Sequence, residues 1–215
     1  MLNEMTSKVI RNSYYGSKRM IDIIVSLIAI VILSPIFLIV AVAIKLEDGG
    51  SIIFKQERSG ENDIPFMIYK FRSMRETEKS SSTPYYVWDN GVPDTFVFKN
   101  TGKQDVRVTK VGSFIRKFSI DELPQFVNVL LGSMSLIGPR PEIVAITSCY
   151  SDKQKQRLMV KPGITGWAQV NGRSDINNGE KIRLDLEYIE KQTAMLDSVI
   201  FFKTVWLVLA GKGSV

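Results

Sequence analysis

"IIVSLIAIVILSPIFLIVAVAI", residues 23–44, is an apolar run without a single charged side chain. As a helix it is long enough to cross a hydrocarbon core of about 30 Å. It is too long for the apolar part of a secretory signal peptide, and no small-residue cleavage site follows it. A core helix that is apolar on every face would need more covering protein than this chain supplies. The run therefore predicts a membrane helix.

Whether this helix crosses the membrane is a separate question. Ser34-Pro35 lies near its middle, where proline removes a helix hydrogen bond and kinks the axis. Basic residues flank the run on both sides, so the positive-inside rule gives no orientation. They are Lys8, Arg11, Lys18 and Arg19 before it, and Lys45, Lys55, Arg58, Lys70, Arg72 and Arg75 after it. The pattern alone leaves two arrangements equally open: a kinked transmembrane helix, or a re-entrant helix that enters and leaves one leaflet.

Composition limits the chemistry of the 215-residue chain. Its formal charge is +6 and its pI about 9.3, which favours anionic partners such as nucleic acid, phospholipid headgroups or phosphorylated substrates. The chain has no histidine and one cysteine, Cys149. This excludes Ser-His-Asp and Cys-His nucleophile pairs, an intramolecular disulfide and most zinc sites. Acid–base or covalent chemistry must use carboxylates, Lys, Tyr or a hard metal such as Mg²⁺.

The rest of the chain reads as one α+β domain that is mostly helical. "SIIFKQE" and "IPFMIYKF" alternate like strands around "RSGEND", which predicts a β-hairpin. Residues 76–105 are polar and predict a long loop. Helices are expected over 111–118, 121–131, 142–159, 180–192 and 196–209. The last is apolar but interrupted by Asp197 and Lys203. It suits an interfacial helix anchored by Lys203 and Trp206, with a buried C-terminal helix as the alternative.

An acidic pair in "KFSIDELPQF", residues 117–126, admits two explanations. Ser119 and Glu122 fit a capping box, with Pro124 in or near the first helical turn. That structural explanation leaves Asp121 as an acid that only suits the helix dipole. In the functional explanation, a carboxylate kept ionised at a helix N-terminus attacks phosphorus and holds a phosphoryl group covalently. Such chemistry needs cations to neutralise the electrophile.

Three further segments carry groups that could bind an anion, and each has an ordinary structural explanation. In "GPRPE", residues 138–142, two prolines restrict the backbone around Arg140. "KFRSMR", residues 70–75, is a phosphate site, a headgroup site or a plain basic surface. "KPGITGWAQVNGR", residues 161–173, brings glycines together with Trp167 and Arg173, which suits anion binding and base stacking but is also common in turns. Individually each signal is weak.

Taken in order, these segments resemble the small monotopic phosphoglycosyl transferases, a bacterial sugar transferase family that begins exopolysaccharide, capsule and glycoprotein glycan assembly. The resemblance covers nearly all of residues 18–210. It rests on "KRMID", on Ser34-Pro35 and on "IIFKQERSG" with "YKFRSM". It continues through "DVRVTKVGSFIRKFSIDELPQFVNVLLGSMSLIGPRPE" and "KPGITGWAQVNGR". Residues 76–105 match poorly, and "EDGGSIIF" lacks a proline that relatives often carry, which leaves the local turn geometry open.

The resemblance implies an architecture and a location. Residues 1–17 would be an N-terminal tail and 18–45 a Ser-Pro-kinked re-entrant membrane helix. Residues 46–215 would form a catalytic domain on the cytoplasmic face of the bacterial plasma membrane, with an interfacial C-terminal helix. The monotopic protein would hand its product to downstream glycosyltransferases, and no nucleic-acid partner is expected.

The resemblance also implies a reaction. Asp121 would attack the sugar-proximal phosphate of a UDP-sugar, release UMP and pass the phosphosugar to undecaprenyl phosphate. Glu122, with Asp121, would help to hold Mg²⁺. The residues implied in substrate or phosphate binding are Gln56, Arg58, Lys70, Arg72, Arg140 and Arg173, and those implied near the membrane or headgroup are Lys18, Arg19, Ser34 and Pro35. Sugar choice is expected within residues 76–105 or 161–190.

Two competing functions remain to be tested. A non-enzymatic membrane-surface protein that binds anionic lipid or nucleic acid would explain the charge and the anchor. It would not explain why the acidic pair, "PRP" and the glycine-tryptophan loop occur together. A phosphatase or a phosphotransferase with another donor is the second alternative, which dependence on the lipid acceptor would separate.

Overall fold

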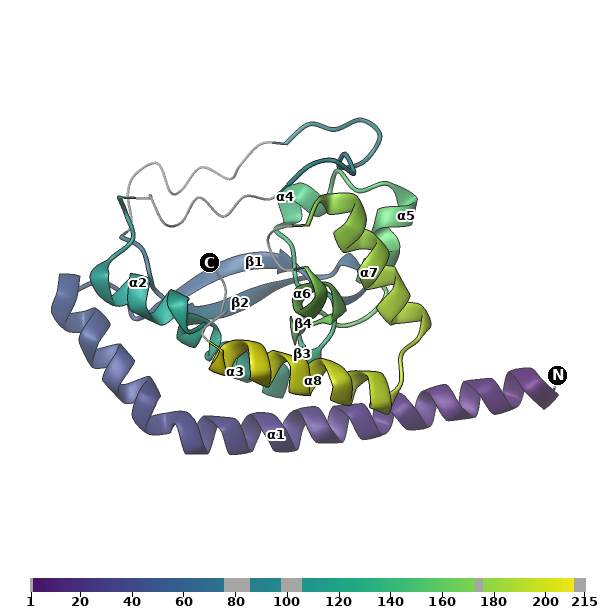
Figure 1. The fold of residues 1–215 in the computed structure, drawn as a ribbon, viewed down its shortest axis with the longest axis horizontal. Coiled ribbons are helices and arrows are strands. Elements are labelled where there is room, and N and C mark those ends of the chain that lie inside the picture. Colours follow the sequence, from purple (N-terminus) through teal and green to yellow (C-terminus); the bar gives the residue numbers. More distant parts are fainter. Residues whose placement is uncertain (1, 76–85, 98–105, 173–175, 211–215) are drawn as a thin grey trace.

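A computed structural model describes residues 2–75, 86–97, 106–172 and 176–210 of the chain. This part is mostly helical, with two small two-stranded sheets (Figure 1). Its α-helices are α1 (Leu2–Asp48), α2 (Lys110–Lys117), α3 (Gln125–Leu131), α4 (Val144–Thr147), α5 (Asp152–Lys155), α6 (Trp167–Asn171), α7 (Asn178–Glu190) and α8 (Ala194–Leu209). Its strands are β1 (Ile53–Ser59), β2 (Pro65–Phe71), β3 (Ser135–Ile137) and β4 (Gly163–Thr165). Three short 3₁₀ turns are η1 (Glu61–Asp63), η4 (Ile120–Glu122) and η5 (Gln156–Leu158).

Helix α1 contains the apolar run and extends beyond it in both directions, including most of the range 1–17. Its segment Ser13–Asp48 is long and apolar enough to span a membrane: an 18-residue stretch within it has a mean hydropathy of 3.2, and 11% of that stretch is buried. In Figure 1 α1 runs beneath the rest of the molecule and bends upward in its C-terminal part. Pro35 lies inside the helix and has no N–H to offer Val31. The Ser34 hydroxyl donates to that same Val31 carbonyl at 2.8 Å, which supplies the missing donor.

Strands β1 and β2 form the predicted antiparallel hairpin, in which Gln56 pairs with Ile68. At its turn, Asn62 and Asp63 adopt φ of 56° and 60°, a left-handed conformation that Asn and Asp tolerate better than most residues. The hairpin buries Ile68 against α3 and Phe71 against α1 and α2. It therefore ties the end of the membrane helix to the remainder of the molecule.

Two of the expected helices are wrong in their extent. The helix expected over 142–159 is broken into α4, α5 and η5, because Ser151 begins a new helix with a capping box to Gln154. The helix expected over 121–131 is divided at Pro124 into η4 and α3. Helices α2, α7 and α8 agree with their expected ranges within a few residues.

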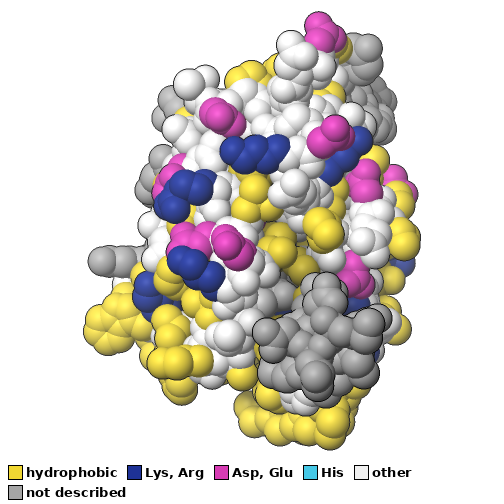
Figure 2. All heavy atoms as spheres, turned by 90° about the vertical axis from the view of Figure 1, so that its right-hand side faces the viewer, with side chains coloured by type: hydrophobic (Ala, Val, Ile, Leu, Met, Phe, Trp, Pro, Cys, Tyr) yellow, Lys and Arg dark blue, Asp and Glu magenta, His cyan; other side chains and the backbone are white. Residues whose placement is uncertain are grey.

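Helix α8 is largely exposed although it is apolar. Phe202 is 69% and Trp206 71% exposed, and Ile200 is its buried residue. The alternative of a buried C-terminal helix is therefore wrong. Hydrophobic side chains concentrate along the lower edge in Figure 2, whereas basic and acidic side chains intermingle higher up. Large exposed apolar patches of this kind mark an interface with protein or membrane.

A buried ion pair stabilises the region behind β3. Arg157 Nη2 lies 2.7 Å from Asp185 Oδ2, and the two side chains are 1% and 2% exposed. The Arg157 guanidinium also donates to the Tyr150 hydroxyl at 3.1 Å and to the Arg140 carbonyl at 2.9 Å. Each of the three nitrogens of this buried charge thus meets an acceptor.

We expect Asp185→Asn to destabilise the protein, because it leaves the Arg157 charge buried without its counter-charge. Loss of one partner of such a pair typically costs about 3–5 kcal/mol. Thermal unfolding in one fixed detergent measures the effect. Glu180→Ala removes an exposed ion pair with Arg183 on the same helix and should leave the midpoint nearly unchanged. Equal losses in the two variants would contradict the importance of the buried pair.

Candidate active site

The acidic pair lies in the short turn η4 and not at the start of a longer helix. Ser119 adopts a left-handed conformation with φ of 55°, and its side chain makes no capping hydrogen bond. The capping-box prediction is therefore wrong. Pro124 is the N-cap residue of α3, directly before the first turn of that helix, and so lies near a first helical turn as predicted. The Glu122 side chain is thus available for other partners.

Glu122 binds two cations from separate segments. Its Oε1 lies 2.7 Å from Lys70 Nζ on β2 and 2.7 Å from Arg140 Nη2 in the loop after β3. The second oxygen lies 3.4 Å from Arg140 Nη1. The Glu122 side chain is 12% exposed. Burial would raise its pKa, but the charges of Arg140 and Lys70 outweigh burial and hold this pKa far below the usual range.

Asp121 has the opposite electrostatic environment. It is half-buried and, within the described part of the chain, its carboxylate makes no ion pair or hydrogen bond. Burial and the adjacent charge of Glu122 raise its pKa to about 6, against the weaker opposing charges of Lys70, Arg140 and Arg116. A carboxylate with a raised pKa is more basic and more nucleophilic than an exposed one, and it faces the same cations as Glu122.

The loop 138–142 is held by its carbonyl groups, since two of its residues are prolines without an N–H. Each consecutive carbonyl accepts a hydrogen bond from a different segment. The donors are Gly163 N to Pro139 at 2.9 Å, Arg157 Nη2 to Arg140 at 2.9 Å, Arg58 Nη1 to Pro141 at 3.3 Å and Ser59 N to Glu142 at 3.0 Å. The backbone below the Arg140 side chain is therefore fixed at every step, which preorganises the guanidinium.

Arg58 is a second guanidinium at this loop. Its Nη2 donates to Gln56 Oε1 at 2.6 Å, and its buried Nε has no partner in the described structure. Burial lowers the pKa of Arg58 to about 10, the charge of Glu142 opposes this, and the charge of Arg140 adds to it. Gln56, Arg58 and Arg140 are thus brought together, as their predicted role in phosphate binding requires.

Lys70 owes its position to a residue that sequence reasoning missed. Asn128 on α3 is 1% exposed and accepts from Tyr69 N at 2.9 Å. Its amide donates to the Met67 carbonyl at 2.7 Å. These two bonds fix the edge of β2 immediately before Lys70. The sequence offered one weak signal for Asn128, which is a polar residue within a predicted helix. Polar residues are common in such helices, so this signal could not identify it as a residue that positions Lys70.

The glycines of the loop 161–173 serve backbone packing. A Cβ on Gly163 would lie 2.1 Å from Gly138 N, and one on Gly166 would lie 2.1 Å from Gly138 O. Strand β4 can therefore pair with β3 only because these positions lack side chains. Trp167 packs under the Lys203 ammonium of α8, 4.7 Å from its ring centre. The structural explanation accounts for these three residues, and Arg173 lies outside the described residues.

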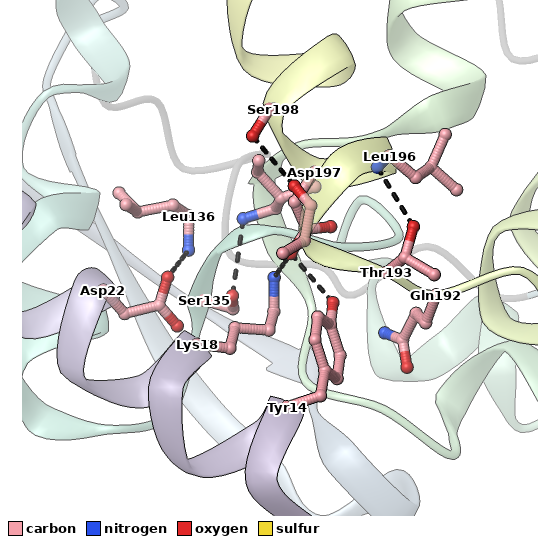
Figure 3. A network of polar contacts seen from close by, with 12 residues as sticks. Tyr14, Lys18, Asp22, Ser135, Leu136, Gln192, Thr193, Leu196, Asp197 and Ser198 are labelled. Atoms are coloured by element: carbon pink, nitrogen blue, oxygen red, sulfur yellow. Dashed lines mark hydrogen bonds and ion pairs between the residues drawn. The ribbon is translucent and has the colours of Figure 1, made fainter. Parts of the chain in front are cut away.

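The remaining predicted residues contact protein groups away from Glu122. Arg72 is buried and pairs with Asp48 at the end of α1. Lys18 lies 2.6 Å from Asp197 on α8, as Figure 3 shows. Arg19 donates to the carbonyls of Val129 and Leu130 at the end of α3, at 2.5 and 2.9 Å. Ser34 and Pro35 lie within α1, far along the sequence from the acidic pair. Their predicted membrane roles stay predictions.

Carboxylates are the ligands that this site offers to a metal. Among the residues described here, no cluster of three acidic, Cys or His side chains comes together. Mg²⁺ usually takes one or two carboxylates together with substrate phosphates and water. Asp121 fits that arrangement, since its oxygens have no described partner, whereas the Glu122 oxygens are occupied by Lys70 and Arg140.

Comparison with known proteins identifies the family. The family described as "Bacterial sugar transferase" matches residues 13–211. An uncharacterized sugar transferase, EpsL, of Bacillus subtilis is 40% identical over 91% of this chain and 89% of its own length.

Two larger relatives carry more specific names. The UDP-glucose:undecaprenyl-phosphate glucose-1-phosphate transferase of Escherichia coli is 39% identical over 92% of this chain and 41% of its own length. The UDP-N-acetylgalactosamine-undecaprenyl-phosphate N-acetylgalactosaminephosphotransferase of Aeromonas hydrophila is 40% identical over 99% of this chain and 48% of its own length. The chain therefore belongs to the bacterial sugar transferase family and is a transferase enzyme, not a non-enzymatic surface protein.

Proposed function

We propose that this enzyme transfers a sugar-1-phosphate from a UDP-sugar to a polyprenyl phosphate, through a phosphosugar bound covalently to Asp121. One observation carries the proposal: a half-buried carboxylate of raised pKa lies beside cations that its neighbour Glu122 holds in place. The names of the relatives support undecaprenyl phosphate as the acceptor class. Since those names differ in the sugar at nearly equal identity, the sugar itself is a matter for experiment.

In the first transfer, an Asp121 carboxylate oxygen attacks the phosphorus that bears the sugar. The bond from that phosphorus to the oxygen shared with the other phosphate breaks, and UMP leaves with the electron pair. Arg140, Lys70 and Arg58 lie where they can bind the phosphate oxygens and stabilise the charge that develops on them. Glu122 keeps two of these cations in place because it is ionised throughout.

In the second transfer, a phosphate oxygen of the lipid attacks the same phosphorus. The Asp121 carboxylate leaves and is regenerated, while the lipid now carries a diphosphate-linked sugar. One phosphoanhydride is broken and another formed overall, so the exchange needs no further energy source. A single carboxylate and one set of cations therefore suffice for both transfers.

Mg²⁺ would reduce the charge of the donor diphosphate when bound. Asp121 is the residue that would hold it, since the Glu122 oxygens are already engaged. Glu122 would then act on the reaction through Lys70 and Arg140. This differs from the direct metal contact that the family resemblance implies for Glu122.

The membrane arrangement is part of the proposal. We propose that α1 is re-entrant and the protein monotopic, on the cytoplasmic face of the plasma membrane. The bend of α1 in Figure 1, its Ser34-Pro35 pair and the basic residues on both flanks support this arrangement. The exposed apolar side chains of α8 would lie in the same interface. A lipid phosphate would thereby reach the site.

The covalent intermediate has a direct test by intact-protein mass spectrometry. Detergent-held enzyme is incubated with Mg²⁺ and a panel that includes UDP-glucose and UDP-N-acetylgalactosamine, without lipid acceptor. We expect one donor to add a sugar phosphate to the wild-type protein and nothing to add to Asp121→Asn. Undecaprenyl phosphate should remove the adduct.

Glu180→Ala serves as the control, since Glu180 is an exposed carboxylate paired with Arg183 and its loss should leave both folding and labelling intact. If the adduct is too short-lived to detect, release of UMP after the lipid acceptor is added would still report the reaction. A folded protein that gives neither an adduct nor UMP with any donor would refute the transferase mechanism.

The pH dependence follows from the pKa of about 6 for Asp121. Only the ionised carboxylate attacks, so kcat/KM for adduct formation should fall about tenfold per pH unit below that value and level off above it. Glu122→Gln removes a charge that raises this pKa and acts on it more strongly than Lys70 or Arg140, whose charges lower it. The midpoint should therefore move to lower pH, while the weaker hold on the two cations lowers the rate. A midpoint that stays or rises would contradict this electrostatic account.

The re-entrant helix predicts that both flanks of the apolar run face one side. Single cysteines at Ser13→Cys and Ser51→Cys, in a Cys149→Ser background, place thiols at exposed positions on either flank. A membrane-impermeant maleimide should label neither in intact spheroplasts and both after lysis. Labelling of one position alone in intact cells would show that α1 crosses the membrane.

A further inference from the structure

Strand β3 has one edge that β4 does not cover. On the covered edge, Ser135 N donates to Pro162 O at 2.9 Å. Successive residues of a strand turn their N–H groups to opposite sides, so Leu136 N points away from β4. It donates to Asp22 Oδ1 of α1 at 3.0 Å (Figure 3). Without Asp22 this amide would be an unpaired donor beside an apolar helix.

Asp22 is unusual for its position on α1. It is 4% exposed, whereas its neighbours Ile21 and Ile23 are 54% and 39% exposed. A carboxylate at the start of an apolar segment is costly to bury, so a buried one needs a defined partner. The backbone N–H of Leu136 in β3 is such a partner.

A second set of contacts holds the same strand from α7. The hydroxyl of Tyr188 on α7 lies 3.2 Å from Ile137 O and 2.8 Å from Asp197 Oδ1 of α8. Lys18 Nζ lies 2.6 Å from Asp197 Oδ2. Helix α1 is therefore bonded to β3 through Asp22 and to α8 through Lys18 (Figure 3), and α8 reaches β3 only through Tyr188 in these contacts. Lys18 and Asp22 both belong to "KRMID".

We propose that Asp22 is a positioning residue for the transferase site, acting through β3 on Arg140. Strand β3 ends at Ile137, and Gly138-Pro139 connects it directly to Arg140. The ring of Pro139 fixes its φ, so a displacement of β3 is passed on to Arg140 instead of being absorbed by the connection. The site geometry then depends on how α1 is seated, which couples catalysis to the membrane helix. This inference rests on the proposed function, in which Arg140 binds phosphate.

Two substitutions of Asp22 separate the loss of its hydrogen-bond acceptor from the loss of its charge. Asp22→Asn keeps an oxygen that can accept from Leu136 N, whereas Asp22→Ala removes it. We expect Asp22→Ala to lower kcat/KM for adduct formation about 10- to 100-fold, as loss of a supporting contact commonly does. Asp22→Asn should retain most of the activity. Equal losses in the two variants would overturn the role of the hydrogen bond.

Ser26→Ala is the matched control. Ser26 lies one helical turn further along α1 and is fully buried, and its hydroxyl has no partner in the described structure. Its loss should leave the reaction unchanged. A loss as large as that of Asp22→Ala would show that any change on this face of α1 disturbs the enzyme, and would overturn the specific tie.

A double-mutant cycle tests whether Asp22 acts through Arg140. If it does, Asp22→Ala should cost little in an Arg140→Ala background, because the group that it positions is already absent. Fully additive losses would mean that Asp22 acts elsewhere, for example only in seating the helix, and would overturn the proposal.

Hydrogen exchange supplies a readout that does not need turnover. Amides in residues 135–142 should exchange faster in Asp22→Ala than in the wild type, Ser26→Ala or Asp22→Asn. Unchanged exchange would overturn the tie even if activity fell. If the wild type forms no adduct and releases no UMP, the proposed function fails, and the exchange result still decides whether Asp22 fixes β3.

Discussion

The carboxylate of Glu122 is the contact on which the site depends. It joins Lys70 of the hairpin to Arg140 of the loop after β3, segments that are far apart in sequence and whose other hydrogen bonds run from Arg58 and Ser59 to the loop backbone. A carboxylate that is 12% exposed would be costly without these cations, and the cations would repel one another without it. The three groups therefore specify a single arrangement, in which the cations are already in place for an anionic substrate.

The two adjacent carboxylates differ because only one of them receives the cations. The cations stabilise Glu122 in its ionised form, whereas burial and the charge of Glu122 raise the pKa of Asp121 to about 6. Neighbouring acids with separated pKa values are a common arrangement for distinct chemical roles. Asp121 is left without a described partner, so it combines reactivity with closeness to a cationic surface.

The supporting structure is built from backbone contacts that single residues make achievable. Gly138, Gly163 and Gly166 allow β3 and β4 to approach each other closely. Arg157 and Arg58 donate hydrogen bonds to the carbonyls of Arg140 and Pro141 in the loop. Asp22 then attaches β3 to α1, and Tyr188 attaches it to α7. The candidate site and the apolar helix α1 are thus parts of one framework, with few contacts separating them.

The sequence by itself determined the apolar helix, the hairpin, the last two helices and the family, because hydrophobic period and ordered motifs are local properties of the chain. It also marked Asp121, Glu122, Arg58 and Arg140. Only the tertiary structure decided that Glu122 binds cations instead of capping a helix, that Asn128 fixes Lys70, and that Lys18, Arg19 and Asp22 bond to α8, α3 and β3. A side chain's partner depends on which distant segments fold beside it, and local pattern carries no information about that distance.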